Sequence, residues 1–183
     1  MKRFWCLLPL LFLGLTATAQ SNTLQAFNQQ QAATLKTGML VLAGWAILNI
    51  LVGSFKLTKA TRSRKFYFQM NLYWNILNLI IAAAALYSIF SRDPSTVSLL
   101  QSLKLHIWYK KVLYLNVGLD VAYIVMGAYL KERSRNSSAK TEQHLGWGQA
   151  LVLQGLFLFL LDLVLVVLLE SSADQLFRLL SLS

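Results

Sequence analysis

The feature that most limits how this chain can fold is a set of four long apolar runs, at residues 38–55, 68–90, 112–130 and 148–169. Each run is close to the ~20 residues that a helix needs to cross the roughly 30 Å hydrocarbon core of a bilayer. None of the runs contains Lys, Arg or His. Only 13% of the 183 residues are charged, about half the usual share in a soluble domain. The runs therefore predict four transmembrane helices.

Residues 1–19 have the organisation of a secretory signal peptide. Lys2 and Arg3 form a basic start, residues 4–15 are mostly apolar, and residues 17–19 (Ala-Thr-Ala) make a small-residue cleavage site. We expect cleavage after this site, which leaves residues 20–183 as a single membrane domain; a retained signal anchor is the alternative. Cys6, the single cysteine, lies in this segment. The mature chain is therefore expected to have no disulfide and no thiolate chemistry.

The net charge of +10 is concentrated in two connecting segments. If the mature N-terminus is translocated, residues 56–67 and 131–147 both lie on the inner side. They carry five and four Lys or Arg residues, nine in all, against six on the outer side. Such an excess is typical of cytoplasmic loops. We therefore expect external mature termini, contact of the basic loops with anionic lipid head groups, and no binding of nucleic acid.

Polar side chains inside the apolar runs form the candidate site. In the second and third runs they recur at steps of three or four, so that each set lies on one helix face. These stripes are Asn71, Asn75, Asn78 and Ala82, and Asn116, Asp120, Tyr123 and Gly127. Because polar groups face lipid at a high energetic cost, the faces are expected to turn toward one another. The fold expected is an all-α, polytopic transmembrane four-helix bundle with a polar axis. The candidate site residues are Asn49, Asn75, Asn78, Asn116, Asp120, Gln154 and Asp162.

The two aspartates have two interpretations. A carboxylate at the bilayer centre costs about 2.5–3.5 kcal/mol on insertion scales, and neither has a basic partner in any run. Asp120 and Asp162 are expected at similar depth, where close carboxyls can share a proton. Either they join helices by hydrogen bonds, as the Asn and Gln side chains do, or they carry protons or cations. Gly118 and Ala122 offer a small-residue face for helix packing.

The segment between the second and third runs predicts an amphipathic helix. Apolar residues recur at steps of four over 99–107, which suits a helix lying in the outer interface with Trp108 as an anchor. His106 is expected in this outer loop and His144 in the inner loop, so a paired-His haem or metal centre is not expected. The sequence indicates no catalytic residue, no metal ligand set and no cofactor.

Several short segments resemble an uncharacterised bacterial family of small membrane proteins, a domain of unknown function with a signal peptide and four helices. The segments are 27–30 (Phe-Asn-Gln-Gln), 36–39 (Lys-Thr-Gly-Met), 74–78 (Trp-Asn-Ile-Leu-Asn), 115–120 (Leu-Asn-Val-Gly-Leu-Asp), 127–130 (Gly-Ala-Tyr-Leu) and 154–157 (Gln-Gly-Leu-Phe). The resemblance spans roughly residues 25 to 165, and 115–120 is its most specific part. It implies a bacterial inner-membrane location and brings no activity.

The sequence thus predicts a non-catalytic integral inner-membrane protein, a scaffold or interaction protein with a polar intramembrane core. The alternative is a small oligomeric transporter or channel-like protein that uses Asp120 and Asp162 for proton or cation handling. Expected partners are the lipid bilayer and either a second copy of the chain or another membrane protein. Seven polar residues are few for a transport path in one protomer, so the alternative requires an oligomer.

Overall fold

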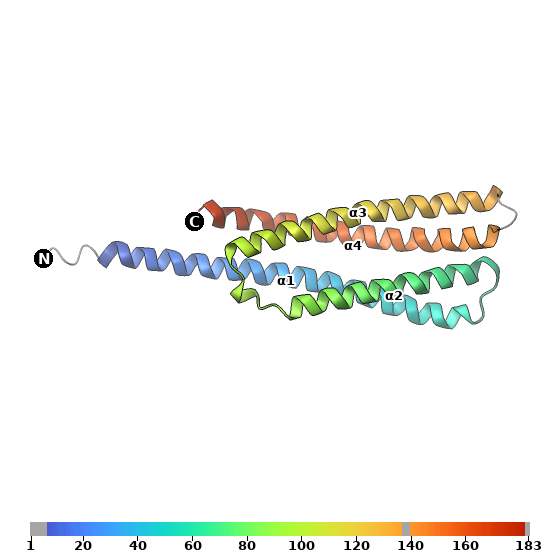
Figure 1. Cartoon of the computed structure of the whole chain (residues 1–183), viewed down its shortest axis with the longest axis horizontal. Coiled ribbons are helices and arrows are strands. Elements are labelled where there is room, and N and C mark those ends of the chain that lie inside the picture. Colours follow the sequence, from blue (N-terminus) through green and yellow to red (C-terminus); the bar gives the residue numbers. More distant parts are fainter. Residues whose placement is uncertain (1–6, 137–139, 182–183) are drawn as a thin grey trace.

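The computed structural model is a bundle of four long helices (Figure 1). It describes residues 7–136 and 140–181, with side chains described for 23–136, 140–174, 176 and 178. The helices are α1 (Leu7–Leu57), α2 (Arg62–Phe90), α3 (Leu99–Asn136) and α4 (Thr141–Ser181), and a short 3-10 helix, η1 (Pro94–Thr96), precedes α3. These described ranges contain no strand, and all four long helices are long and apolar enough to cross a membrane. The all-α prediction is confirmed.

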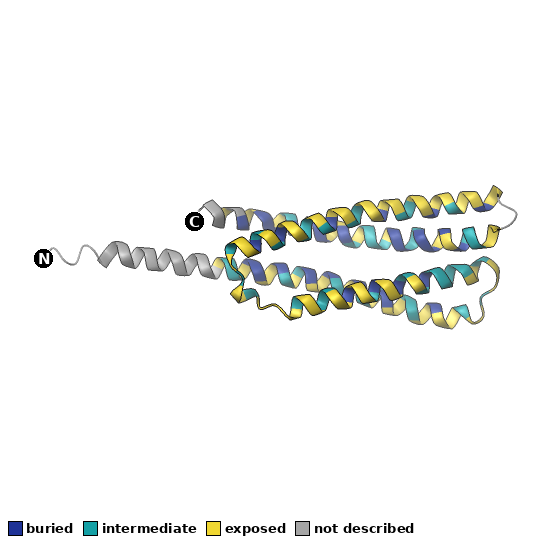
Figure 2. Cartoon of the chain, in the orientation of Figure 1, coloured by how far each residue is buried: buried dark blue, intermediate teal, exposed yellow. Residues whose placement is uncertain are grey.

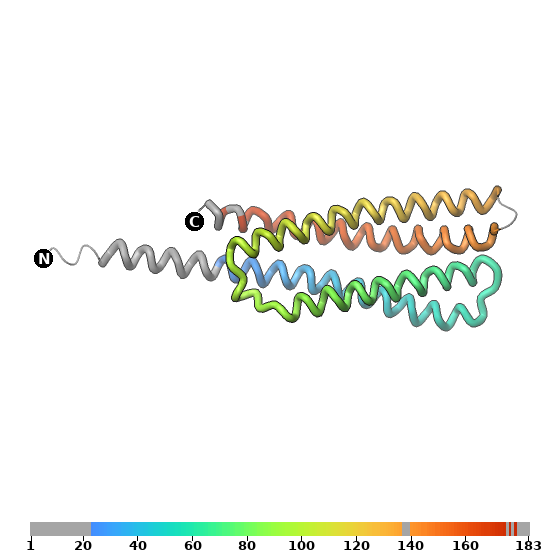
Figure 3. The backbone as a smooth tube through the Cα atoms, viewed as in Figure 1, coloured from blue at the N-terminus to red at the C-terminus, as the bar shows by residue number. Residues whose placement is uncertain are grey.

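The two ends of the bundle differ in what they carry. The α1–α2 connection and the facing ends of α3 and α4 lie at one end, and residues 91–98, which join α2 to α3, lie at the other (Figure 3). We call the second the connection end. The first six residues of the expected signal peptide lie outside the described residues, and α1 runs through its remainder from Leu7.

Each helix extends beyond the apolar run within it. The third run, 112–130, is the second half of α3, which begins at Leu99. The sequence predicted that the amphipathic stretch forms a separate helix in the interface. In the structure this stretch is instead the first part of α3. No Gly or Pro interrupts residues 99–117, and Lys110 and Lys111 are good helix formers, so nothing ends the helix between the two parts.

The fourth helix is the centre of the bundle. It packs against α1, α2 and α3, whereas α3 packs mainly on α4, and α1 packs along α2. Buried residues accordingly run along the inner helix faces while the outward faces stay exposed (Figure 2). Toward the connection end, Leu35 of α1 and Leu113 of α3 meet Leu165 and Leu169 of α4 in an apolar core. The membrane-length part of α4 is 33% buried, against 17% in α2 and α3, which fits its central place.

Close glycine contacts set the spacing of α3 and α4. A Cβ added to Gly127 would lie 2.7 Å from the carbonyl oxygen of Gly148, and one added to Gly155 would lie 3.1 Å from the carbonyl oxygen of Asp120. Small residues allow helix backbones to approach this closely in membranes. The predicted small-residue face at Gly118 is wrong, because a Cβ there would meet nothing within 4 Å and Ala122 is exposed.

Candidate functional site

The predicted site residues lie on the inner faces of the helices. Asn75, Asn78, Asp120, Gln154 and Asp162 are buried, and Asn49 and Asn116 are intermediate. In α2 the buried residues are Asn71, Asn75, Asn78 and Ala82, the polar stripe of the second run. The structure divides these residues into an amide cluster at α1, α2 and α4, and a carboxyl region with Asp120 on α3 and Asp162 on α4.

Asn71 is the centre of the amide cluster. Its Nδ2 donates to Asn49 Oδ1 at 2.9 Å, and its Oδ1 accepts from Asn75 Nδ2 at 3.2 Å and from Gln154 Nε2. Gln154 Oε1 in turn accepts from Trp45 Nε1 at 3.0 Å. These bonds join α1, α2 and α4 directly. Asn71 is missing from the candidate residues named from the sequence, although its place on the polar stripe of the second run was the signal that could have found it.

Aromatic packing closes one side of the amide cluster. The Trp45 ring of α1 stacks on the Phe157 ring of α4, with centroids 4.0 Å apart and planes 6° from parallel. Asn49 Nδ2 also donates to the Trp45 carbonyl oxygen at 2.9 Å. Interhelical hydrogen bonds in membrane proteins contribute about 0.6 kcal/mol each on average, up to about 1.7. Several of them in one place fix the register of three helices.

The two aspartates differ in depth along the bundle. Gly155 packs against the Asp120 backbone, and Asp162 follows Gly155 by seven residues, about 10 Å along α4. The contacts of Gly148 and Gly155 with α3 bring Asp162 level with residues near Asn116, one turn from Asp120 toward the connection end. Asp162 thus lies nearer in depth to Asn116 than to Asp120, which differs from the similar depth predicted for the two aspartates.

Four buried polar atoms in the middle of α2 and α3 have no partner among the described side chains: Trp74 Nε1, Asn75 Oδ1, Asn78 Nδ2 and Asp120 Oδ2. The Trp74 ring meets Tyr123 edge-on, with centroids 4.7 Å apart. The helices α2 and α3 run antiparallel. Asn78 is one turn beyond Trp74, and Asp120 is three residues before Tyr123. The unpartnered atoms of Asn78 and Asp120 therefore lie at similar depth, where bound water could satisfy them.

A second polar cluster, which the sequence reasoning missed, lies at the connection end. His106 Nδ1 donates to Gln31 Oε1 at 2.8 Å, and Ser102 Oγ donates to Asn28 Oδ1 at 2.7 Å. The Phe27 ring packs on the His106 ring, with centroids 5.7 Å apart. The prediction that placed His106 in a loop is wrong: the residue is buried within α3 and faces α1. Polar side chains spaced along the first part of α3 and along α1 before residue 38 were the available signal.

The opposite end of the bundle has a basic groove between the end of α1 and the start of α2. Its lining includes Lys56, Lys59 and Arg64 together with Phe55 and Phe68. The Lys56 ammonium lies above the Phe68 ring, 6.0 Å from its centroid. Within the described residues, no three His, Cys, Asp or Glu side chains gather as they would around a metal ion.

Fold and site together define an all-helical chain whose four helices can each cross a membrane and whose polar side chains collect between them. The chain belongs to a family of unknown function, DUF6992, which it matches over residues 41–163. This range includes all seven candidate site residues and leaves out Asn28 and Gln31. No curated protein and no solved structure matches the chain.

Proposed function

We propose that this chain is a multi-pass protein of the bacterial inner membrane that acts as a non-catalytic scaffold or interaction protein. In this proposal the signal peptide is cleaved and both mature termini are external. The observation that carries it is the amide cluster around Asn71, in which polar groups from three helices bond to one another. Apart from Asn75 Oδ1, which has no partner among the described side chains, these amides satisfy one another, and such bonds hold helices in place.

The proposal is tested by site-specific photo-crosslinking of the full chain in native membranes. Crosslinkers at exposed positions of three helices, Ile80 of α2, Val125 of α3 and Val164 of α4, sample different outward faces. A scaffold should give one defined protein adduct, a second copy or another membrane protein, from one of these faces. Gln154→Leu, which breaks the amide cluster, should weaken that adduct. Lipid adducts alone at every position would contradict the proposal.

The basic groove supports a contact with anionic lipid head groups. Lys59 and Arg64 are exposed, and each basic residue near an anionic surface contributes about 1 kcal/mol of attraction. Lys59→Gln should reduce retention of phosphatidylglycerol in nanodiscs of mixed lipid. Lys104→Gln is the matched control, because Lys104 is an exposed cation at the other end of the bundle. Equal loss in both variants would argue against a specific role for the groove.

A second candidate function is proton or cation handling by an oligomer, and the unpartnered Asp120 Oδ2 favours it. Asn in place of Asp120 keeps the size and hydrogen-bonding capacity but removes the charge and the exchangeable proton. If the chain carries ions, Asp120→Asn should abolish flux into liposomes without lowering thermal stability. Parent protein that produces no proton or cation flux would exclude this candidate and favour the scaffold.

A further inference from the structure

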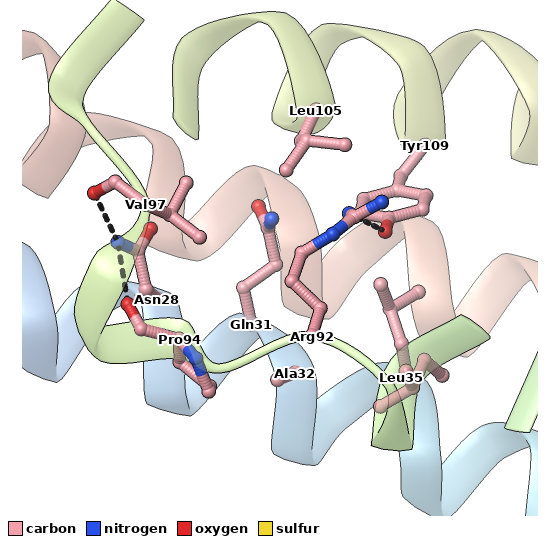
Figure 4. Close-up of a pocket in the computed structure, with 10 residues that line it drawn as sticks. Asn28, Gln31, Ala32, Leu35, Arg92, Pro94, Val97, Leu105 and Tyr109 are labelled. Atoms are coloured by element: carbon pink, nitrogen blue, oxygen red, sulfur yellow. Dashed lines mark hydrogen bonds between the residues drawn. The ribbon is translucent and has the colours of Figure 1, made fainter. Parts of the chain in front are cut away.

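A small pocket lies at the connection end, between α1, the end of α2 and the start of α3 (Figure 4). It offers about 40 Å³ to water-sized occupants, room for a few water molecules. Apolar side chains, among them Leu35, Ile89 and Leu105, form most of its wall, and Gln31, Arg92 and Tyr109 supply polar groups. The pocket is separate from the polar residues at mid-bundle, and the inference drawn from it does not depend on the proposed function.

The wall of the pocket is held by side-chain hydrogen bonds. Asn28 Nδ2 donates to the carbonyl oxygens of Pro94 at 3.2 Å and Val97 at 3.3 Å, which ties the connection to α1 (Figure 4). Asn28 Oδ1 accepts from Ser102 of α3. One buried side chain thus joins α1, the connection and α3, so the pocket is formed before a ligand arrives.

Gln31 presents an unused donor to this space. The residue is 5% exposed, and its Oε1 is occupied by His106 Nδ1. Its Nε2 amide has no partner among the described side chains. Figure 4 shows the Gln31 side chain directed into the space between Asn28 and Arg92. This amide donor is therefore available to a ligand oxygen.

Arg92 brings a positive charge to the same place. Its Nη1 donates to Tyr109 Oη at 3.2 Å, which leaves most of its five N–H donors unused. The neighbouring Asp93 carboxylate accepts from Ser95, and the Glu170 carboxylate of α4 pairs with Lys110 at 2.7 Å. Within the described side chains Arg92 has no ion pair.

We propose that the pocket binds a carboxylate attached to a short apolar group, with Arg92 and Gln31 as donors to its oxygens. A guanidinium fork matches the two coplanar oxygens of a carboxylate. The apolar wall at Leu35, Ile89 and Leu105 would cover the attached carbons. A phosphate has oxygens on all sides, so it would place some of them against that apolar wall. Such a carboxylate can come from a free short-chain acid or from a fatty acid in the bilayer.

The test is titration of the full chain in nanodiscs of zwitterionic lipid. Hexanoate tests a free acid, and dodecanoate incorporated in the nanodisc tests a fatty acid. Two compounds are controls: hexanol has the apolar group without the carboxylate, and inorganic phosphate is a different oxyanion. We expect saturable binding of hexanoate or dodecanoate and no binding of hexanol or phosphate. Calorimetry and saturation-transfer NMR measure the binding. Binding of hexanoate identifies a free acid as the source, and binding of dodecanoate alone identifies the bilayer.

Two variants and one control test the residues. Arg92→Gln removes the charge and Gln31→Glu replaces the amide donor with a second carboxylate that still accepts from His106. Each should weaken carboxylate binding by about 10-fold or more, since hydrogen bonds to charged groups are strong, with helicity and thermal stability retained. Lys104→Gln, the loss of an exposed cation on α3 away from the pocket, should leave binding unchanged. Absence of saturable carboxylate binding, equal binding of phosphate, or unchanged affinity in Arg92→Gln would overturn the proposal.

Discussion

Gly127 of α3 and Gly148 of α4 lie face to face, so that a Cβ on either would come within 2.7 Å of the other's carbonyl oxygen. Backbone atoms on both sides of the contact cannot move aside as the end of a flexible side chain can. The two helices that share the most extensive contact in the bundle are therefore spaced by the absence of a side chain at these two positions.

Gly127→Ala should lower the free energy of unfolding by about 1–3 kcal/mol, the usual range for overpacking. The added methyl group would press on the Gly148 carbonyl oxygen and on Val152. Gly118→Ala is the control on the same helix, since nothing lies within 4 Å of its added Cβ. It should be neutral or stabilise by up to about 1 kcal/mol through helix propensity. Unfolding in mixed micelles measures both, and equal effects would contradict the close approach.

Gln154→Leu should destabilise the bundle by about 1–3 kcal/mol, because it leaves Trp45 Nε1 and one acceptor site of Asn71 Oδ1 without their partner. Gln149→Leu is the control, since Gln149 lies on the same helix and is exposed. A double-mutant cycle with Trp45→Phe isolates the indole bond. Additive effects of the two changes would show that the indole and the amide are not energetically coupled.

Asn28→Ala should loosen the connection between α2 and α3. It removes both bonds to the carbonyl oxygens of Pro94 and Val97 and leaves Ser102 Oγ without its Asn28 acceptor. Hydrogen exchange at the amides of residues 95–99 should become faster, while exchange at mid-bundle stays unchanged. Gln29→Ala, a change at an exposed neighbour on α1, should leave exchange in the connection as it is. Protection retained in Asn28→Ala would show that other contacts hold this segment.

Asp93 should make the start of η1 sensitive to acid. Its carboxylate accepts from Ser95 N at 2.9 Å and Ser95 Oγ at 2.8 Å, and these bonds lower the pKa of Asp93 below its usual range. The stabilisation is therefore complete above the unfolded-state pKa, about 3.9, and is lost as the pH falls through the lower pKa of the folded state. A carboxyl titration by NMR should give a lowered pKa in the parent and a smaller lowering in Ser95→Gly, which loses the Oγ bond but keeps the backbone N–H bond. Identical values would argue against the capping bonds.

Reporter fusions test the expected threading. Fusions after Leu57 and Glu142, which lie at the same end of the bundle (Figure 1), should both read cytosolic, because the basic residues gather there. A fusion at Ser98, at the connection end, should read external. An external signal from within residues 59–65 would reverse the expected topology.

Spacing within one helix was enough to predict which faces turn inward. Asn71, Asn75 and Asn78 recur with the helical period, and they are the polar residues that α2 buries. The relation of Asp120 to Asp162 depends instead on how α3 slides along α4, and glycine contacts between the two helices fix that register. No spacing within a single helix contains this information. The signal peptide and the role of the aspartates stay predictions.

The cluster at His106 was missed for a different reason. Its members lie outside the apolar runs, so a search for polar groups within those runs passes over them. They meet because α3 continues without a break from Leu99 to Asn136, which brings Ser102 and His106 against α1. A long helix whose first part is amphipathic and whose second part is apolar looks, in sequence, like two separate segments.

The central place of α4 has a consequence for biogenesis. This helix follows the other three along the chain, so Asn71 and Asn75 must enter the membrane before Gln154 has been synthesised. Until then their amides can bond within α2 and to Asn49 of α1, but the Asn71 acceptor site that Gln154 later occupies has no partner. Insertion of α4 is thus the step that converts a lipid-exposed polar face into an interior one. Ribosome-associated chains that stop before α4 should be the species that membrane proteases and chaperones recognise.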